Sequence, residues 1–462
     1  MLKLSEILKI TSGIPSSIDN LNTTISAFSI DTRTLQSGNI FVALQGATAH
    51  GNDFISDAIA RKASAIITDK PINTNFPCIL VSDSLHALSQ IAAHQRLHFQ
   101  GQVCAITGTS GKTSVKEALS FICTQLGLNV HKSEKSYNNH IGVPLTIANL
   151  PSNADVAFIE IGMNHPGEIL PLTVLSNPHI AVITTIGPGH LGAFNSVKEI
   201  ALEKVSIVAG LVKNGVAILP RDSEFFDVIH DISTQQYKRD VITFGNSSKA
   251  DIQATAVDII DANKVHISAR IMNTLISYHL PTAHAGWVQN SLSILAAINI
   301  LELDIIAAAE QFHKLPFIDG RGRTHLLTLN DKRVTVIDDA YNANPLSMSA
   351  ALNTLTHYPG SRKIAVIGDM RELGNFSEAY HTEIGQLCRQ LGIEKVLTCG
   401  TLMQYAFEQL LPSQRLAHVL EYNDVFQVLS ETLQDGDVVL LKASNGVKLY
   451  HVASDLLAAS QN

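Results

Sequence analysis

The sequence contains few cysteines, and none of them stands in a motif that pairs thiols. The five are Cys78, Cys104, Cys123, Cys388 and Cys399, without CxxC or other metal-ligand spacing. Cys104 lies in an apolar, strand-like run, where a buried free thiol is the expected state. The cysteines therefore argue against a thiolate metal site and favour a protein of a reducing compartment.

Long apolar runs and an excess of basic residues are also missing. No run approaches the about 20 residues that span a bilayer. The N-terminal stretch MLKLSEILKI has the spacing of an amphipathic helix rather than of a signal peptide. The net charge is −8 and no basic stripe is present, so a nucleic-acid partner is not expected, and local sites must hold any anionic ligand. We expect a cytoplasmic protein with no membrane span.

A chain of 462 residues is too long for one hydrophobic core. Residues 1–100 mix short strand-like runs with helical stretches, which predicts a small α/β domain. The expected strands are Ala27–Ile30, Ile40–Leu44, Ala63–Thr68 and Cys78–Val81, and the expected helices are Phe54–Arg61 and Ser84–His98.

Residues 101–315 alternate apolar, β-branched strands with helices, of which the last is expected at Val288–Leu301. The strands are VCAIT (103–107), VAFIEI (156–161), IAVITTI (180–186) and VAIL (216–219). Continuous apolar strands suit a parallel sheet that is covered on both faces. We predict a central parallel-sheet domain here.

The Pro- and Gly-containing stretch Leu315–Arg323 indicates a linker. Residues 316–462 then repeat the α/β rhythm, with strands at 334–338, 363–368, 395–400 and 437–443. This pattern is typical of a doubly wound, Rossmann-like domain, although GxGxxG is absent from its first turn. The predicted fold class is therefore α/β with three domains.

The sharpest motif is TGTSGKTS (107–114), directly after one strand and before a helical run. Backbone N–H groups of a glycine-rich turn at a helix N-terminus bind phosphate oxygens. Lys112 adds positive charge for the β- and γ-phosphates, and the Thr113 hydroxyl can ligate Mg²⁺. The usual loop has glycine where Ile106 stands here. The strand–turn–helix context nevertheless favours a P-loop ATPase-like domain over a coincidental Gly-Ser turn.

Polar side chains also follow the next two strands. Glu160 ends its strand at the edge where open α/β sheets bind ligands, within reach of Mg²⁺; the alternative is a cap on the following turn. His190 follows a strand and two glycines. A lone histidine is usually structural, but here three successive strands each end in a group suited to phosphate or metal.

Two basic residues have clear structural alternatives. Lys204 lies on the helix after His190, where a lysine is by default solvated. Arg321 lies in the linker sequence Gly320-Arg321-Gly322-Arg323. Its planar guanidinium suits bidentate phosphate binding, whereas a flexible, solvated linker is the competing interpretation, especially for Arg323.

The stretch after the strand at 334–338 is rich in acids and amides. Two acids and two amides at the carboxyl end of a strand are ligand-facing candidates, among them Asp339 and Asn344. Asn344-Pro345 is also a good helix start, so we expect part of this cluster to serve as a cap.

Together these motifs resemble the Mur ligase family. The matching stretches are TGTSGKT (107–113), YNNHIGVPLT (137–146), EIGMNHPGEI (160–169), the His190 segment, DDAYNANPLSMSAAL (338–352), GDMRELG (368–374), SIDTR (29–33) and GNIFVALQG (38–46). The resemblance implies an ATP-dependent amide ligase of peptidoglycan precursor synthesis. It would activate the carboxylate of UDP-N-acetylmuramoyl-tripeptide as an acyl phosphate and join it to D-alanyl-D-alanine.

The resemblance also implies roles for domains and residues. Residues 1–100 would bind the UDP-sugar, 101–315 would bind ATP, and 316–462 would close over both and bind the dipeptide, in a monomer. Lys112, Glu160, His190 and Lys204 would be catalytic, with Thr113, Glu160, His190 and, if carbamylated, Lys204 holding two Mg²⁺ ions. Nucleotide contacts are implied for Thr107, Gly108, Thr109, Ser110, Gly111, Lys112, Thr113, Asn290, Arg321 and Asp339. Substrate contacts are implied for Asp31, Arg33, Asn138, Asn139 and Asn344.

The chain departs from the family pattern in four places. The usual Lys-x-Glu is Lys204-Val205-Ser206 here, so the acidic partner is missing. The usual Gly-x-His-Asn before Asn290 is replaced by a stretch that contains Gly286 and Trp287, so its histidine is missing too. Pro220-Arg221-Asp222 replaces Asn-Ala-Asp, and Lys442-Ala443-Ser444-Asn445 replaces Lys-Gly-Ser-Arg.

Three other functions remain open. They are another Mur-type or folylpolyglutamate-type amide ligase, a P-loop kinase or other NTPase, and a nucleotide-binding module without catalysis. The sequence does not distinguish lysine from diaminopimelate at the third position of the peptide.

Overall fold

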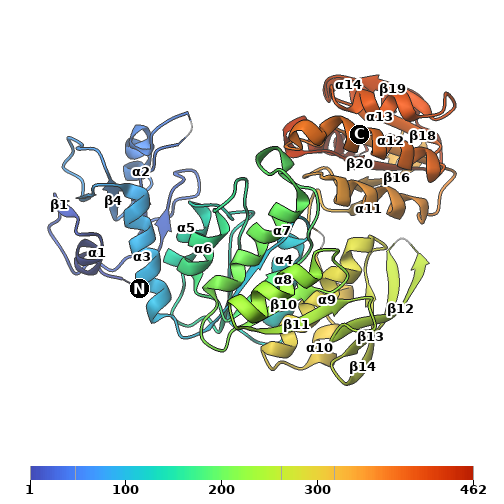
Figure 1. Ribbon diagram of the computed structural model, residues 1–462. Helices are drawn as coiled ribbons and strands as arrows, with labels where there is room; N and C mark the ends of the chain where they lie inside the picture. The colour runs from blue at the N-terminus through green and yellow to red at the C-terminus, as the bar shows by residue number, and fades with distance from the viewer. Residues whose placement is uncertain (1, 47, 262, 317, 461–462) are drawn as a thin grey trace.

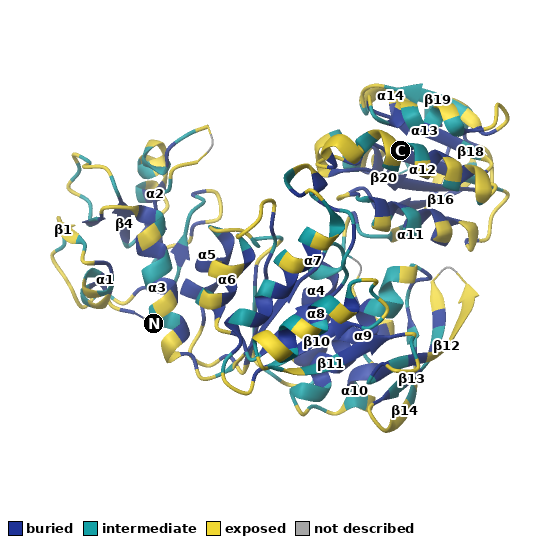
Figure 2. Cartoon of the chain, in the orientation of Figure 1, coloured by how far each residue is buried: buried dark blue, intermediate teal, exposed yellow. Residues whose placement is uncertain are grey.

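The computed structural model describes residues 2–46, 48–261, 263–316 and 318–460. Three sheets follow one another along the chain, and each is the centre of an α/β unit (Figure 1). The strands are the most deeply buried elements, while the helices turn exposed faces outward (Figure 2). The three-unit α/β architecture confirms the predicted fold class.

The N-terminal unit has a five-stranded sheet of order β1-β5-β4-β3-β2. Its strands are β1 (Ile14–Ser16), β2 (Phe28–Ser29), β3 (Ile40–Val42), β4 (Ala65–Thr68) and β5 (Cys78–Leu80), and its helices are α1 (Leu4–Thr11), α2 (Ile55–Ala60) and α3 (Ser84–His98). The predicted strands and helices of this unit are confirmed, and β1 is an additional strand that was not predicted. The N-terminus of α3 is capped by the Asp83 carboxylate, which accepts a hydrogen bond from the His86 N–H. The helix packs on two helices of the next unit, α5 (Gly142–Ala148) and α6 (Ile169–Ser176).

The central unit has a nine-stranded sheet of order β14-β13-β12-β11-β10-β9-β6-β8-β7. The strands are β6 (Gln102–Thr107), β7 (Val130–Lys132), β8 (Val156–Glu160), β9 (Ile180–Ile183), β10 (Val216–Pro220), β11 (Asp240–Gly245), β12 (Ile252–Asp261), β13 (Lys264–Ile271) and β14 (Thr274–Leu280). Pairing is parallel from β7 to β12. The antiparallel edge β12–β14 extends the predicted parallel sheet. Its strand β13 alternates buried and less buried residues, as expected where one face of the sheet is exposed to solvent.

Helices cover this sheet and connect its strands. They are α4 (Lys112–Gln125), α5 (Gly142–Ala148), α6 (Ile169–Ser176), α7 (Val197–Val205), α8 (Phe226–Asp231), α9 (Ala285–Ile300) and α10 (Ile305–Ala309), with the short 3₁₀ helix η2 (Leu191–Ala193) before α7. Because β9, β6 and β8 are neighbours and parallel, the loops that follow them open on the same edge of the sheet.

The C-terminal unit has a six-stranded sheet of order β15-β16-β20-β17-β18-β19. Its strands are β15 (Arg323–Leu329), β16 (Lys332–Asp338), β17 (Arg362–Gly368), β18 (Lys395–Cys399), β19 (Arg415–Val419) and β20 (Asp437–Lys442). Its helices are α11 (Pro345–Thr356), α12 (Ser377–Gln390), α13 (Met403–Gln409), α14 (Asn423–Thr432) and α15 (Tyr450–Ala459), with 3₁₀ helix η6 (Gly374–Phe376). The four predicted strands are confirmed; β15 and β19 add the two edges. Helix α11 faces the central unit and contacts α9 (Figure 1).

Two further expectations can be checked directly. All five cysteines are free and buried, as predicted. Across the described residues, no helix combines the length and the apolar character that a bilayer crossing requires.

Candidate active site

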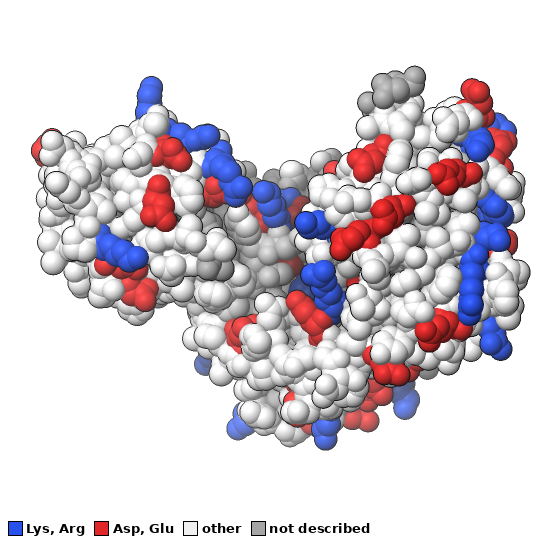
Figure 3. All heavy atoms as spheres, turned by 90° about the horizontal axis from the view of Figure 1, so that it is seen from above, with Lys and Arg blue, Asp and Glu red and all other residues white. Residues whose placement is uncertain are grey.

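A cavity of about 490 Å³ lies between the central and C-terminal units. The central unit contributes Glu160, His190, Asn290 and residues of the glycine-rich loop Thr107–Thr113 (the phosphate loop). The C-terminal unit contributes Arg321 and residues that follow β16. Seen from above, the molecule is deeply hollowed between its N-terminal lobe and the rest, and charged side chains gather along the hollow (Figure 3). The tertiary structure thus brings most of the predicted site residues to one place.

Glycine is required at two positions of the phosphate loop. At Gly108 (φ +150°) an added Cβ would lie 1.9 Å from Thr184 Oγ1. At Gly111 (φ +87°) it would lie 2.5 Å from Asn290 Oδ1. Only glycine combines these backbone angles with such close neighbours. Asn290, for which a nucleotide contact was implied, therefore packs directly on the loop.

The loop is also hydrogen-bonded to the segment that follows β9. The Thr109 N–H donates to the Thr185 carbonyl at 2.9 Å, and the Ser110 N–H donates to the Thr185 hydroxyl at 3.0 Å. Lys112 Nζ donates to the Gly108 carbonyl at 2.7 Å. Burial lowers the pKa of Lys112. Its ammonium therefore gains from any anion that enters the cavity.

The Glu160 carboxylate is buried at the end of β8. Its Oε1 accepts a hydrogen bond from Asn138 Nδ2 at 2.7 Å. Its Oε2 lies 3.5 Å from Lys116 Nζ and accepts no hydrogen bond. Among the described contacts neither oxygen accepts an N–H from the following turn, so the capping alternative is wrong. The sequence analysis missed Lys116, although its place one helical turn after Lys112, in an apolar run, was a usable signal.

His190 has a left-handed backbone (φ +60°). Its Nδ1 lies 2.5 Å from the Glu372 Oε2 of the C-terminal unit. The His190 ring holds the pKa of the Glu372 carboxyl below its ordinary value. Glu372 belongs to the GDMRELG stretch but was not predicted as a site residue.

The side chains of the cavity suit Mg²⁺ that is bound together with a nucleotide. No three His, Cys, Asp or Glu side chains of the described residues cluster into a metal-binding group. Mg²⁺ prefers oxygen ligands and is commonly held by one or two carboxylates together with water and substrate phosphates. The Glu160 Oε2, which accepts no hydrogen bond, and the Thr113 hydroxyl on the same cavity wall fit this pattern. A nucleotide phosphate would supply the remaining oxygens.

Lys204 is buried, contrary to the solvated alternative. The residue is 2% exposed, and its Nζ lies 3.9 Å from Met163 Sδ. Burial, and then the positive charge of Lys112, lowers the pKa of Lys204 well below its ordinary value. The neighbouring Glu203 carboxylate is engaged elsewhere, by the N–H groups of Gly167 and Ile169.

The N-terminal end of α9 carries two aromatic rings that the sequence analysis did not single out. His284 caps the helix, because its Nδ1 accepts a hydrogen bond from the Gly286 N–H at 3.1 Å. His284 and Trp287 both line the cavity. Trp287 is the single tryptophan of the chain. The expected family histidine is replaced by Gly286, but a histidine ring stands two residues earlier.

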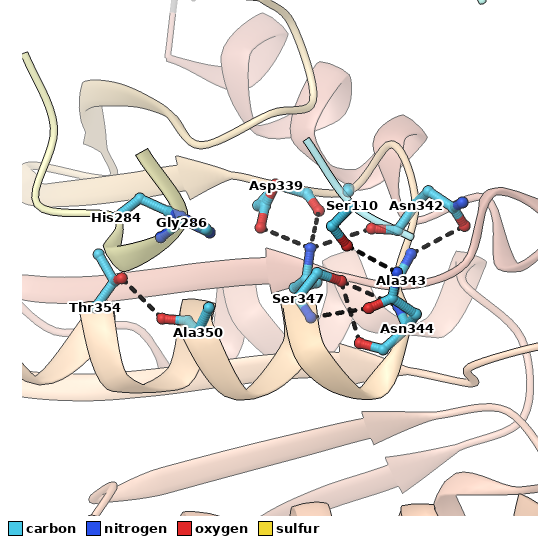
Figure 4. Close-up of polar contacts among 12 residues, drawn as sticks. Ser110, His284, Gly286, Asp339, Asn342, Ala343, Asn344, Ser347, Ala350 and Thr354 are labelled. Carbon is cyan, nitrogen blue, oxygen red and sulfur yellow. Dashed lines mark hydrogen bonds and ion pairs between the residues drawn. The ribbon is translucent and has the colours of Figure 1, made fainter. Parts of the chain in front are cut away.

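Asn344 both caps a helix and crosses the domain boundary. Its Oδ1 accepts a hydrogen bond from the Ser347 N–H at 2.9 Å, which starts α11 with Pro345 in its first turn. Its Nδ2 donates to the Ser110 hydroxyl of the phosphate loop at 2.9 Å (Figure 4). The expected capping role is confirmed, and the loop contact is added to it.

Asp339 forms a buried ion pair with a lysine from β20. Lys442 Nζ lies 2.6 Å from Asp339 Oδ2 and also donates to the Asn342 carbonyl at 3.1 Å. All three residues line the cavity. Lys442 was noted only for its altered motif, yet its Nζ fixes the orientation of the carboxylate.

Arg321 is held in place by the glycines on either side. The Gly320 N–H donates to Asp338 Oδ2 at 3.1 Å, and the Gly322 N–H donates to the Asp338 carbonyl at 2.8 Å. The guanidinium lies 4.4 Å above the Tyr341 ring and donates to the Thr113 hydroxyl at 3.2 Å. The flexible-linker alternative does not fit Arg321. Phe317, within the predicted linker, lies outside the described residues.

Arg323 differs from Arg321, as the sequence analysis allowed. Its guanidinium pairs with Asp319 at 2.5 Å, with both side chains largely exposed. It does not line the cavity in the described part of the chain.

A second cavity, of about 900 Å³, lies between α3 of the N-terminal unit and α6 of the central unit. Asn138 and Asn139 line it, and Asn138, Met163 and Asn164 also line the first cavity. The two cavities therefore meet around Asn138. Asn139 additionally accepts hydrogen bonds from the N–H groups of Ile141 and Gly142 at the start of α5.

Asp31 and Arg33 are not among the described residues that line either cavity. They form an ion pair of 2.7 Å with each other. The hydrogen bond from Arg33 lowers the pKa of the Asp31 carboxyl, with a smaller contribution from the charge of Lys135.

Three family models match consecutive parts of the chain. They are the Mur ligase family catalytic domain at residues 24–96, the Mur ligase middle domain at 106–298 and the Mur ligase glutamate ligase domain at 322–445. The UDP-N-acetylmuramoyl-tripeptide–D-alanyl-D-alanine ligase of Rickettsia prowazekii (strain Madrid E) is 33% identical and covers 97% of this chain and 98% of its own. The ligase of the same name from Bacillus subtilis (strain 168) is 32% identical and covers 94% of both chains.

Solved structures of Mur ligases are also similar to this chain over most of its length. A crystal structure of MurF from Acinetobacter baumannii has a TM-score of 0.88 at 26% identity, over 99% of this chain and 98% of that one. The MurF ligase from Thermotoga maritima in complex with ADP has a TM-score of 0.79 at 26% identity, over 94% and 98% of the two chains.

Proposed function

Because the chain belongs to the Mur ligase family, we infer that it is an ATP-dependent amide ligase of peptidoglycan precursor synthesis. It joins D-alanyl-D-alanine to the peptide carboxylate of UDP-N-acetylmuramoyl-tripeptide. The observation that carries this function is the meeting of two cavities at Asn138, one lined by a phosphate loop and one reaching the N-terminal unit. Such an arrangement suits a reaction between a nucleotide and a second, larger substrate.

The proposed chemistry has two steps. An oxygen of the peptide carboxylate forms a bond to the γ-phosphorus of ATP as the bond to the β–γ bridging oxygen breaks, which releases ADP and leaves an acyl phosphate. The dipeptide amine then attacks the acyl carbon, loses a proton, and phosphate leaves. The first step brings anions together, and Lys112 and Arg321 on the cavity wall offset that repulsion.

We propose residue roles on the same basis. Lys112 and the loop Thr107–Thr113 hold the phosphates, with Asn290 on the base side and Arg321 and Asp339 on the side of the C-terminal unit. The contacts of Gly111 with Asn290 and of Thr113 with Arg321 support this assignment. Asn344 would face the incoming dipeptide, and its bond to Ser110 supports a position beside the reacting phosphate.

For the metal we propose two Mg²⁺ ions, held with the help of Thr113, Glu160 and His190. Bound Mg²⁺ would neutralise phosphate charge and orient the γ-phosphate. The buried Glu160 Oε2, which accepts no hydrogen bond, supports this role.

We also propose that Lys204 is carbamylated and reaches a metal through the new carboxylate. A lysine must be neutral to react with CO₂, and burial, which lowers the pKa of Lys204, makes its neutral amine more accessible than that of an exposed lysine. Activity of a Lys204→Ala variant should be partly restored by short carboxylic acids. Lys198→Ala, at an exposed position of the same helix, should neither lose activity nor respond to the acids. A Lys204→Ala variant with full activity would contradict the proposal.

For the substrate side we propose residues 1–100 as the UDP-sugar domain, 101–315 as the ATP domain and 316–462 as the domain that closes over both. Asp31, Arg33, Asn138 and Asn139 would contact the UDP-linked substrate. The second cavity, which lies between the first two units, supports a substrate path that ends beside Glu160. Because one chain lines both cavities, we propose a monomer, active in the cytoplasm where ATP is supplied.

The function is tested by phosphate release from ATP, with each substrate omitted in turn. Release should require both UDP-N-acetylmuramoyl-tripeptide and D-alanyl-D-alanine. Release that is indifferent to the dipeptide would instead indicate a kinase or simple NTPase. Parallel reactions with lysine- and diaminopimelate-containing tripeptides identify the third residue of the natural substrate.

A further inference from the structure

The loops of His190 and Glu372 meet across the domain boundary. The proposed ligation reaction assigns no role to this contact. Glu372 lies between β17 and η6 in the C-terminal unit, and its Oε2 is 2.5 Å from His190 Nδ1. The segment leading into α7 reaches up to the C-terminal unit at this place (Figure 1). The Glu372 side chain is 62% exposed, so its contact with His190 adds little to stability. Stability alone does not explain it.

Both partners have an unfavourable backbone conformation. His190 has φ +60° and Glu372 has φ +68°, in the left-handed region that residues with a side chain rarely adopt. Such conformations cost free energy and persist where the surroundings enforce them, which is often at functional sites. Here the two strained residues face each other from different domains.

The two backbones are also in direct contact. The Gly192 N–H donates to the Glu372 carbonyl at 2.8 Å. A Cβ added at Gly374 (φ +57°) would lie 2.7 Å from the Gly192 Cα. A side chain at position 374 would therefore push the loops apart, and the two glycines make the close approach of His190 and Glu372 possible.

The contact constrains the chemistry of the His190 ring. The 2.5 Å approach of the carboxylate to Nδ1 favours the tautomer with the proton on Nδ1, which leaves the lone pair on Nε2 free. Histidines that bind metals ordinarily donate their other N–H to a carboxylate or carbonyl, and this partner fixes the tautomer and the ring orientation.

We propose that Glu372 is a positioning residue that fixes the His190 ring for metal binding only while the C-terminal unit is closed on the central unit. The inference rests on the proposed role of His190 as a metal ligand. Closure then completes the metal site and raises its affinity for the metal. By linkage, the bound metal with its nucleotide raises the equilibrium constant for closure by the same factor.

The test uses the full chain with ADP and Mn²⁺ as the metal probe. Glu372→Ala should weaken Mn²⁺ binding, followed by electron paramagnetic resonance, by about tenfold. Amide hydrogen exchange should become faster in residues 190–194 and 370–376. Glu372→Gln, which keeps an acceptor without the charge, should have a smaller effect. Glu378→Ala, at an exposed position of α12, is the matched control and should change neither measurement.

Gly374→Ala provides an independent variant that leaves the carboxylate intact. It should separate the loops, speed exchange in both and weaken Mn²⁺ binding. Unchanged Mn²⁺ affinity in Glu372→Ala overturns the proposal, as does weaker binding with faster exchange throughout the chain, which would indicate general damage. Failure of the proposed function would appear differently, as phosphate release from the unaltered chain that does not need the dipeptide.

Discussion

Single residues in this protein acquire their roles from burial and from their neighbours. Helix α4 carries Lys112 and Lys116, and helix α7 carries Lys204. Lys116 donates to a backbone carbonyl, whereas the described hydrogen-bond partner of Lys204 is a sulfur atom. A buried ammonium without a charged partner is costly, so the neutral form is favoured. The different environments, rather than the residue type, decide which lysine is suited to bind phosphate and which to react with CO₂.

Lys112→Ala should remove the positive charge that we propose faces the γ-phosphate. Turnover should fall by about 10²- to 10³-fold, the typical cost of removing one preorganised transition-state contact. Binding of the UDP-linked substrate should stay within a factor of about two, because its proposed domain lies on the other side of the central unit. Steady-state kinetics and calorimetry measure the two quantities. Equal losses in both would contradict the domain assignment.

Lys204 should make stability depend on pH. Between its lowered pKa and the value near 10.4 of a free lysine, the unfolded chain binds a proton that the folded chain does not. The free energy of unfolding contributed by this group therefore rises with pH across that window. In CO₂-free buffer Lys204→Met should be more stable than the unaltered protein near pH 7, by a margin that shrinks towards pH 10. Urea unfolding at several pH values measures this, with exposed Lys198→Met as the unaffected control.

At the scale of elements, strand order concentrates the chemistry. The strands β9, β6 and β8 are neighbours in the sheet although β7 and the three helices α4, α5 and α6 lie between them in the chain. Their carboxyl ends place the phosphate loop between Glu160 and the His190 segment. Helix α11 approaches from the opposite side, with its N-terminus on the phosphate loop (Figure 4). A helix N-terminus carries partial positive charge, so this approach suits an anionic ligand.

The two functions of Asn344 can be separated by substitution. Asn344→Ala removes the cap of α11 and should cost about 1 kcal/mol of stability. Asn344→Asp keeps a side-chain oxygen for the Ser347 N–H and should keep most of that stability, but it places negative charge beside the phosphate loop. We expect a higher KM for ATP with Asp and a lower melting temperature with Ala. Identical behaviour of the two variants would show that the cap and the loop contact are inseparable.

On the scale of the whole molecule, the nucleotide cavity belongs to two units at once. Arg321, Tyr341 and Asn344 reach the phosphate loop or its neighbours from the C-terminal side. A ligand in this cavity therefore holds both units together. Binding to the folded state alone stabilises it by about 2.7 kcal/mol at a ligand concentration of 100 times Kd.

ADP with Mg²⁺ should raise the melting temperature of the protein, and the rise should depend on Arg321. Arg321→Ala loses the contact with Thr113, so the rise at a fixed ADP concentration should shrink to less than half. Arg323→Ala, from the same linker but exposed and paired with Asp319, should leave the rise unchanged. Scanning fluorimetry measures both. A similar loss in the two variants would indicate a general effect of charge instead of a specific contact.

Local patterns were sufficient for much of the fold. Apolar, β-branched runs predicted the buried strands. A strand that pairs along both edges and is covered on both faces needs such a continuous apolar run. The antiparallel strands β12–β14 were missed, since their alternating, half-exposed pattern is a weaker signal. The motifs identified the phosphate loop, Glu160 and His190, but not Lys116, Trp287 or Glu372. Their importance depends on partners that are far away in the sequence.

The sequence by itself determined the three α/β units, the phosphate loop and the family, because strand pattern, loop glycines and motif order are local properties of the chain. Only the tertiary structure decided that Lys204 is buried, that Arg321 is docked while Arg323 is not, and that Glu372 meets His190. Burial and contacts between domains arise when distant segments pack together. Their free energies depend on that packing, and no local pattern of residues encodes it.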